Sequence, residues 1–178
     1  MDIESTLLSQ HQQSKPVAIA VAQYAVGDEA HFAELMSCFL SPDYRLCQRA
    51  AYSLGFACQF APTLIIPYLS QMIKQLERSD NPPSAIVRNT VKIFAEIDIP
   101  DHLHGSLMTH CFQYICSGEA PKAVKAYSLT ILHKLSKLYP DIRSELELTI
   151  RERMDFESAA FRSRGKRILQ WLVKNRNP

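Results

Sequence analysis

The feature of this sequence that most constrains its fold is a recurrence of just under forty residues. Pro62, Pro100 and Pro140 follow one another at intervals of 38 and 40 residues, and apolar residues at helical spacing follow each of them. A second series, this time of basic residues, recurs at intervals of 39, 37 and 37 residues: Arg49, Arg88, Lys125 and Arg162. Two interleaved series with one period indicate a unit of two helices repeated along the chain.

Within each unit, apolar residues recur at three- and four-residue spacings, which is typical of a helix with one buried face. The chain has only five glycines, and no segment sustains the alternation of a strand. Prolines mark the helix starts, because a proline suits the first helical turn, where its missing N–H would have no partner. They are Pro16, Pro42, Pro62, Pro82, Pro83, Pro100, Pro121 and Pro140. We expect helices over residues 15–25, 28–40, 42–60, 62–78, 83–97, 100–116, 121–139, 141–154 and 158–175. A short helix near residues 3–12 could precede them.

The expected fold is all-α: an α–α superhelix of about four to five stacked helical hairpins of the HEAT or armadillo type. One hairpin cannot bury its apolar stripe alone, so neighbouring hairpins share a continuous core. The length of 178 residues suits a single domain over residues 1–178. A compact helical bundle is the rival architecture, but it gives no reason for the recurrence.

The cysteines indicate a reducing compartment. They are odd in number, form no CxxC pair and lie in apolar helical stretches: Cys38, Cys47, Cys58, Cys111 and Cys116. We expect all of them to be reduced and buried. The polar start at residues 1–13 does not resemble a signal peptide, and the apolar run 17–26 is shorter than the ~20 residues that span a bilayer. A cytoplasmic location is therefore expected.

Charge is distributed unevenly along the chain. Residues 1–120 carry a net charge of −5, whereas residues 121–178 carry +7. This asymmetry indicates a partner for the basic end.

The last expected helix is the best candidate for a site. At 100° per residue its buried face holds Phe161, Gly165, Ile168, Leu169 and Leu172. One flank then gathers Arg164, Arg167, Trp171 and Lys174, and the other flank holds Arg162 and Lys166. Such a basic stripe with an aromatic residue could bind phosphates or an acidic peptide, and Trp171 could stack on a base or on an arginine. The alternative is structural, because a terminal helix needs a solvated face and Trp171 could simply cap the core.

Two other groups of residues have simpler interpretations. The recurrent basic residues Arg49, Arg88, Lys125 and Arg162 could each pair with an acidic residue of the adjacent unit or form a ladder for a polyanion. His102, His104 and His110 do not have the three- or four-residue spacing by which ligands share a helix face. We expect them at a solvated helix start and expect no metal and no cofactor.

A family resemblance rests on three segments, KAYSL at 125–129, PDI at 140–142 and SAAFRSRGKRIL at 158–169. They resemble a family of short HEAT-like proteins of Bacteroidetes that has no established activity. The resemblance therefore implies a fold and not a function. Some members carry an adenylosuccinate lyase label. True lyases of that superfamily are far longer and use a Ser- and Gly-rich signature loop with a catalytic serine, and no segment here resembles that loop.

The sequence favours a non-enzymatic interaction scaffold that binds a protein partner on its helical surface. No nucleotide-binding, hydrolase or zinc-protease motif occurs. The alternative is a nucleic-acid binder that uses the basic C-terminal third of the chain.

Overall fold

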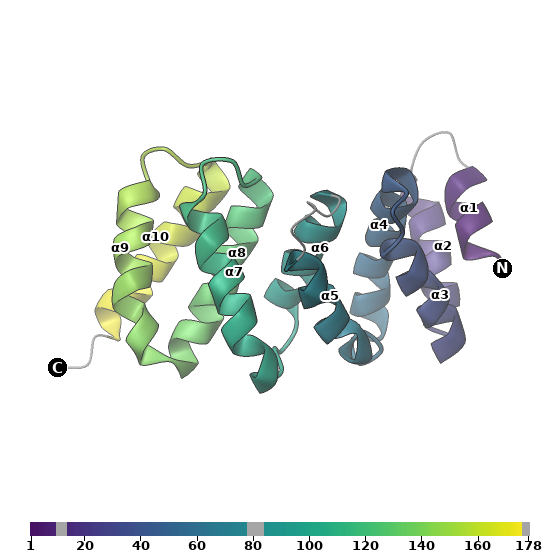
Figure 1. Ribbon diagram of the computed structural model, residues 1–178, viewed down its shortest axis with the longest axis horizontal. Helices are drawn as coiled ribbons and strands as arrows, with labels where there is room; N and C mark the ends of the chain where they lie inside the picture. Colours follow the sequence, from purple (N-terminus) through teal and green to yellow (C-terminus); the bar gives the residue numbers. More distant parts are fainter. Residues whose placement is uncertain (10–13, 78–83, 176–178) are drawn as a thin grey trace. The chain divides into compact units, whose positions relative to one another are not determined.

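The computed structural model describes residues 1–9, 14–77 and 84–175 (Figure 1). Every regular element in these residues is helical, so the expected all-α class is confirmed there. The α-helices are α1 (Ile3–Ser9), α2 (Lys15–Ala25), α3 (Glu29–Phe39), α4 (Tyr44–Phe60), α5 (Leu69–Leu76), α6 (Ser84–Glu96), α7 (His104–Cys116), α8 (Lys122–Leu138), α9 (Arg143–Arg153) and α10 (Ala159–Lys174). The expected helix end at Arg78 and helix start at Pro82–Pro83 lie outside the described residues.

Side-chain caps fix several helix starts. Asp28 accepts a hydrogen bond from the Ala30 N–H at 2.6 Å, and Asp43 accepts one from the Leu46 N–H at 2.8 Å. Ser14 and Ser158 cap α2 and α10 in the same way. Each cap satisfies an N–H that has no partner within its helix. The expected helix starts near residues 15, 28, 42 and 158 are therefore correct to within two residues.

Three expected helices begin later than predicted. Pro62 is followed by a turn and then by the 3₁₀ turn η1 (Ile66–Tyr68), so that α5 begins only at Leu69. Likewise η2 (Asp101–Leu103) precedes α7, and η3 (Pro140–Ile142) precedes α9. The proline positions do mark where the chain turns, but the first turn there is a tighter helix.

The described chain forms two compact units, 1–93 and 94–178, with the division inside α6. In the first unit, α2 and α3 both pack against α4. Helix α1 packs on the same three helices and buries Ile3 and Leu7. The short N-terminal helix is therefore present over Ile3–Ser9. The single domain expected over 1–178 stays a prediction.

In the second unit, α8 packs against α7 and α10, and α10 packs against α9. Figure 1 shows these four helices as neighbouring rods in green and yellow. Their shared core includes fully buried Leu107, Leu132, Leu135, Ile150 and Phe161. Across the described residues, α1 with α2, α3 with α4, α7 with α8, and α9 with α10 are packed helical pairs, which confirms the expected hairpins at these four places.

Candidate interaction surface on helices α8 and α10

Helix α10 packs in the orientation that the sequence predicted. Four of the five residues expected on its core face are buried, namely Phe161, Gly165, Ile168 and Leu172, whereas Leu169 is only part-buried. Gly165 lies close to α9, since a Cβ there would lie 3.0 Å from Ile150 and from Met154. This packing turns the basic flank of α10 toward α8.

Arg164 bridges from α10 to α8. Its Nε donates a hydrogen bond to Thr130 Oγ1 at 3.2 Å, and its guanidinium lies over the Tyr127 ring, 5.6 Å from the centroid. The ring quadrupole attracts the guanidinium. This contact between an arginine and Tyr127 was not predicted from the sequence.

Trp171 is half-buried among residues from two other helices. The His133 ring of α8 meets it edge-on at 5.0 Å, and Arg143 of α9 lies over it at 5.2 Å. Lys137 Nζ lies 5.9 Å from the same ring. Arg143 is itself held by hydrogen bonds to the carbonyls of Ser136 and Asn175, at 2.9 and 3.1 Å. The indole therefore helps to close the end of the α8–α10 pair, as its structural interpretation predicted.

The exposed side of this pair is strongly cationic. Helix α8 contains four lysines and α10 contains five lysines or arginines, and neither contains an aspartate or glutamate. The pKa of His133 is lowered, first by burial and then by the charges of Lys137 and Arg167. We name the surface formed by Lys137, Arg164, Arg167 and Trp171 the α8–α10 cationic face; Arg167, Lys137 and the nearby Lys174 are exposed.

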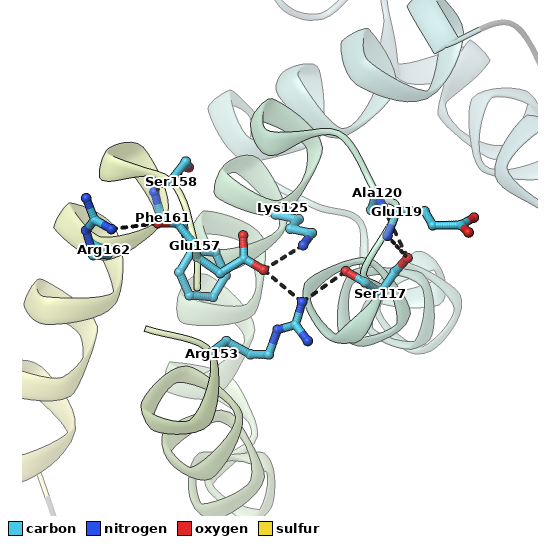
Figure 2. A network of polar contacts seen from close by, with 9 residues as sticks. All are labelled: Ser117, Glu119, Ala120, Lys125, Arg153, Glu157, Ser158, Phe161 and Arg162. Atoms are coloured by element: carbon cyan, nitrogen blue, oxygen red, sulfur yellow. Dashed lines mark hydrogen bonds and ion pairs between the residues drawn. The ribbon is translucent and has the colours of Figure 1, made fainter. Parts of the chain in front are cut away.

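The other two predicted site residues lie apart from this face. Arg162 donates a hydrogen bond from Nη1 to the Glu157 carbonyl at 2.9 Å, in the loop before α10 (Figure 2). Lys166 is exposed. Arg162 therefore has a local structural role.

The recurrent basic residues do not form a solvent-facing ladder. Lys125 is buried, and its Nζ lies 2.5 Å from Glu157 Oε1, while Arg153 Nη2 reaches the same oxygen at 2.9 Å (Figure 2). Arg49 is also buried and donates to the Leu7 carbonyl. Arg88 is exposed. The predicted acidic pairing is correct for Lys125, and burial rules out direct polyanion contact by Lys125 and Arg49.

Glu157 is the centre of this buried network. Burial raises the pKa of its carboxyl, but the hydrogen bonds and charges of Lys125 and Arg153 outweigh burial, so that the pKa lies below its usual value. Arg153 also donates to the Ser117 carbonyl at 3.2 Å. The loop between α9 and α10 is thereby tied to the loop between α7 and α8.

Comparison with protein families now identifies the fold. The family model described as a HEAT repeat domain matches residues 4–172. The chain is a HEAT-repeat protein. No curated protein and no solved structure matches it. HEAT repeats generally serve as interaction scaffolds, because stacked hairpins present an extended binding surface.

The histidines of this HEAT-repeat protein differ from their expected setting. His104 is buried, with Nδ1 2.9 Å from the Tyr139 hydroxyl and Nε2 2.8 Å from the Ile99 carbonyl. The expected solvated helix start is therefore wrong for His104, because Tyr139 and the Ile99 carbonyl enclose its ring, whereas His102 is exposed as expected. Among the described residues, no group of three histidines, cysteines or acidic residues could hold a metal ion.

Four of the cysteines are buried as expected, but Cys116 is exposed at the last turn of α7. Burial raises the pKa of Cys38 and of Cys47 to about 11 and that of Cys111 to about 12. These three thiols therefore stay protonated at neutral pH and are poor nucleophiles. No helix in the described part of the chain is both long and apolar enough to cross a bilayer.

The sequence analysis missed a second aromatic surface, on α4 of the first unit. Tyr52, Phe56 and Phe60 recur at intervals of four, with ring centroids 5.2 and 6.5 Å apart. Lys15 Nζ of α2 lies 6.0 Å from the Phe56 centroid. We name these three rings the α4 aromatic ridge. The regular spacing was the available signal, but helical spacing alone does not distinguish an exposed row from a buried one.

Proposed function

We propose that this HEAT-repeat protein is a non-enzymatic scaffold of the cytoplasm that binds a protein partner, and that the α8–α10 cationic face contacts that partner. The observation that carries the proposal is the group of exposed Lys137, Arg167 and Lys174 beside part-buried Arg164, on two helices that contain no carboxylate. A face of one charge sign steers an oppositely charged partner and accelerates its association.

The ring contacts support an acidic protein segment as the partner of this face. Tyr127 and Trp171 already hold cationic side chains, which leaves less ring surface for stacking with a base. A guanidinium stacked on a ring keeps its edge N–H groups directed outward, where a carboxylate can accept two of them. Arg164, whose guanidinium lies over Tyr127, and exposed Arg167 are proposed as carboxylate-binding residues, Trp171 as a positioning residue and exposed Lys174 as an additional cation.

Affinity capture with matched charge variants tests the proposal. Lys137→Glu/Arg167→Glu reverses two exposed cations of the face, and Lys122→Glu/Lys166→Glu reverses two exposed cations away from it. From nuclease-treated cytosolic extract, we expect the parent and the second variant to retain a protein that the first variant loses. Equal recovery by all three would exclude the α8–α10 cationic face as the contact surface.

Nucleic-acid binding is the second candidate, because the same cations could neutralise phosphates. Its signature is a steep salt dependence, with a log–log slope of about −0.9 per neutralised phosphate on duplex DNA. Titration of fluorescent DNA and RNA at low salt measures it. Absence of binding at low salt would exclude this candidate. Equal binding by the parent and by Lys137→Glu/Arg167→Glu would exclude the α8–α10 cationic face as the site of nucleic-acid binding.

A further inference from the structure

The α4 aromatic ridge lies on a helix that already buries another face. Ala50, Leu54 and Ala57 of α4 are fully buried, whereas Tyr52 is 38% exposed and Phe60 is 48% exposed. Phe56 is half-buried between them. Three contacting rings that core packing does not cover form an apolar patch of the kind that marks interaction sites.

The geometry of the ridge suits a helical occupant. Side chains four residues apart form a row inclined to the helix axis, and such rows pack into the grooves of a second helix. From Tyr52 to Phe60 the row extends about 12 Å, or roughly two helical turns. An aromatic row of that length can anchor two or three apolar side chains of a facing helix.

The charges beside the ridge select an acidic occupant. Lys15 of α2 lies near Phe56. The Nζ of Lys92, on α6, lies close to α4, because a Cβ placed on Gly55 would be 3.6 Å from that nitrogen. Helices α2 and α4 contain no aspartate or glutamate. Ammonium groups from two other helices therefore accompany the rings, with no carboxylate of α2 or α4 to neutralise them.

We propose that the α4 aromatic ridge docks an acidic amphipathic α-helix of a partner protein. Apolar residues at four-residue spacing in that helix contact Tyr52, Phe56 and Phe60, and flanking carboxylates contact Lys15 and Lys92. This surface belongs to the first unit and shares no residue with the α8–α10 cationic face. It is thus a second contact, beyond the proposed function.

Synthetic peptides of about four helical turns test this proposal against the full chain. One peptide has leucines at every fourth position flanked by glutamates, a second replaces the glutamates with lysines, and a third is proline-rich and acidic. Binding is measured by calorimetry and by the chemical-shift changes of the labelled chain. We expect the glutamate peptide alone to bind, with shifts centred on the ridge.

Matched variants locate the site. Tyr52→Ser/Phe60→Ser removes two exposed rings and should weaken binding about tenfold, as loss of aromatic anchors does at interfaces. Lys15→Glu should weaken it as well, whereas Phe156→Ser, which removes an 85% exposed ring elsewhere, should not. Circular dichroism checks that each variant is folded.

Several results would overturn the proposal. They are no binding of the glutamate peptide, equal binding by Tyr52→Ser/Phe60→Ser, or tighter binding of the proline-rich peptide. Self-association of the chain that the same double variant abolishes would identify a second copy as the occupant instead. Lys137→Glu/Arg167→Glu should bind the glutamate peptide as the parent does, so that failure here and failure of the proposed function are distinguishable.

Discussion

Glu157 shows how one side chain can organise a buried polar site. A single carboxylate oxygen accepts from both Lys125 and Arg153, and Lys125 and Glu157 are almost completely buried. A buried pair of this kind adds little net stability compared with an apolar pair, but removal of one partner leaves an uncompensated charge. Glu157 therefore affects the free energy of unfolding mainly through the destabilisation that follows when its charge is removed.

We expect Glu157→Gln to lower the free energy of unfolding by about 3 kcal/mol, because the buried ammonium of Lys125 loses its counter-charge. Urea denaturation near neutral pH measures the change. The control is Glu152→Gln, which neutralises an exposed carboxylate of α9 and should cost less than about 0.5 kcal/mol. Equal losses in the two variants would contradict the assignment.

The pH dependence of this variant provides a second measurement of the same effect. The pKa of Glu157 is lower in the folded protein than its usual value of about 4.3. Ionised Glu157 therefore contributes stability above that usual pKa, and the contribution is lost as pH falls through the lower, folded pKa. The difference between the parent and Glu157→Gln should shrink in acid; a difference that grows would have the wrong sign.

At the scale of a helix, a comparison of Gly165 with Gly105 shows how helix propensity and side-chain packing affect stability. Both are helical glycines, but a Cβ on Gly165 would lie 3.0 Å from Ile150 and Met154, whereas a Cβ on Gly105 would have no atom within 4 Å. Alanine is favoured over glycine in a helix. The two sites therefore differ in the space available to a side chain: Gly105 is exposed in the first turn of α7, and Gly165 is buried in the middle of α10.

We expect Gly105→Ala to raise the free energy of unfolding by about 0.5 kcal/mol, because it gains helix propensity without a clash. Gly165→Ala should gain nothing, since its neighbours must move apart, and Gly165→Val should cost about 1–3 kcal/mol by overpacking. Thermal and urea denaturation of the three variants measures these changes. Stabilisation by Gly165→Val would show that α9 and α10 are less closely packed than described.

Over the whole molecule, charge is sorted by helix rather than by chain half. Helices α2, α4, α6, α8 and α10 together hold fourteen lysines and arginines but one carboxylate, Glu96. Helices α1, α3, α5, α7 and α9 hold four basic and six acidic residues. Both proposed contact surfaces lie on the even-numbered helices, which carry most of the basic residues of the described helices.

The reactivity of the cysteine thiols measures whether the whole chain is folded. We expect Cys116 to react with a thiol reagent in the native protein, because it is exposed, and Cys38, Cys47, Cys58 and Cys111 to react only after unfolding. Mass spectrometry of labelled peptides across a urea series measures this order. Rapid native labelling of Cys111, a fully buried residue, would contradict the described core of the second unit.

The helical class, the repeat and most helix ends could be predicted from the sequence. Helical periodicity, proline positions and capping side chains are local properties, so they can be read within one turn or one repeat. The core face of α10 was predicted from periodicity alone, and only Leu169 departs from it. The start of α5 was missed because Pro62 opens a turn and a 3₁₀ element before the α-helix.

The availability of polar and aromatic side chains to a partner depends on the packing of distant helices and could not be predicted from the sequence. Lys125 and Arg49 resemble surface cations in the sequence, but both are buried in the structure. Their partners lie about thirty to forty positions away: Glu157 for Lys125 and the Leu7 carbonyl for Arg49. Tyr52 and Phe60 resemble core residues and yet lie exposed. Whether a side chain is buried depends on which other elements pack against its helix. A periodic sequence pattern predicts the direction in which a side chain points, but it does not identify the residues that contact it.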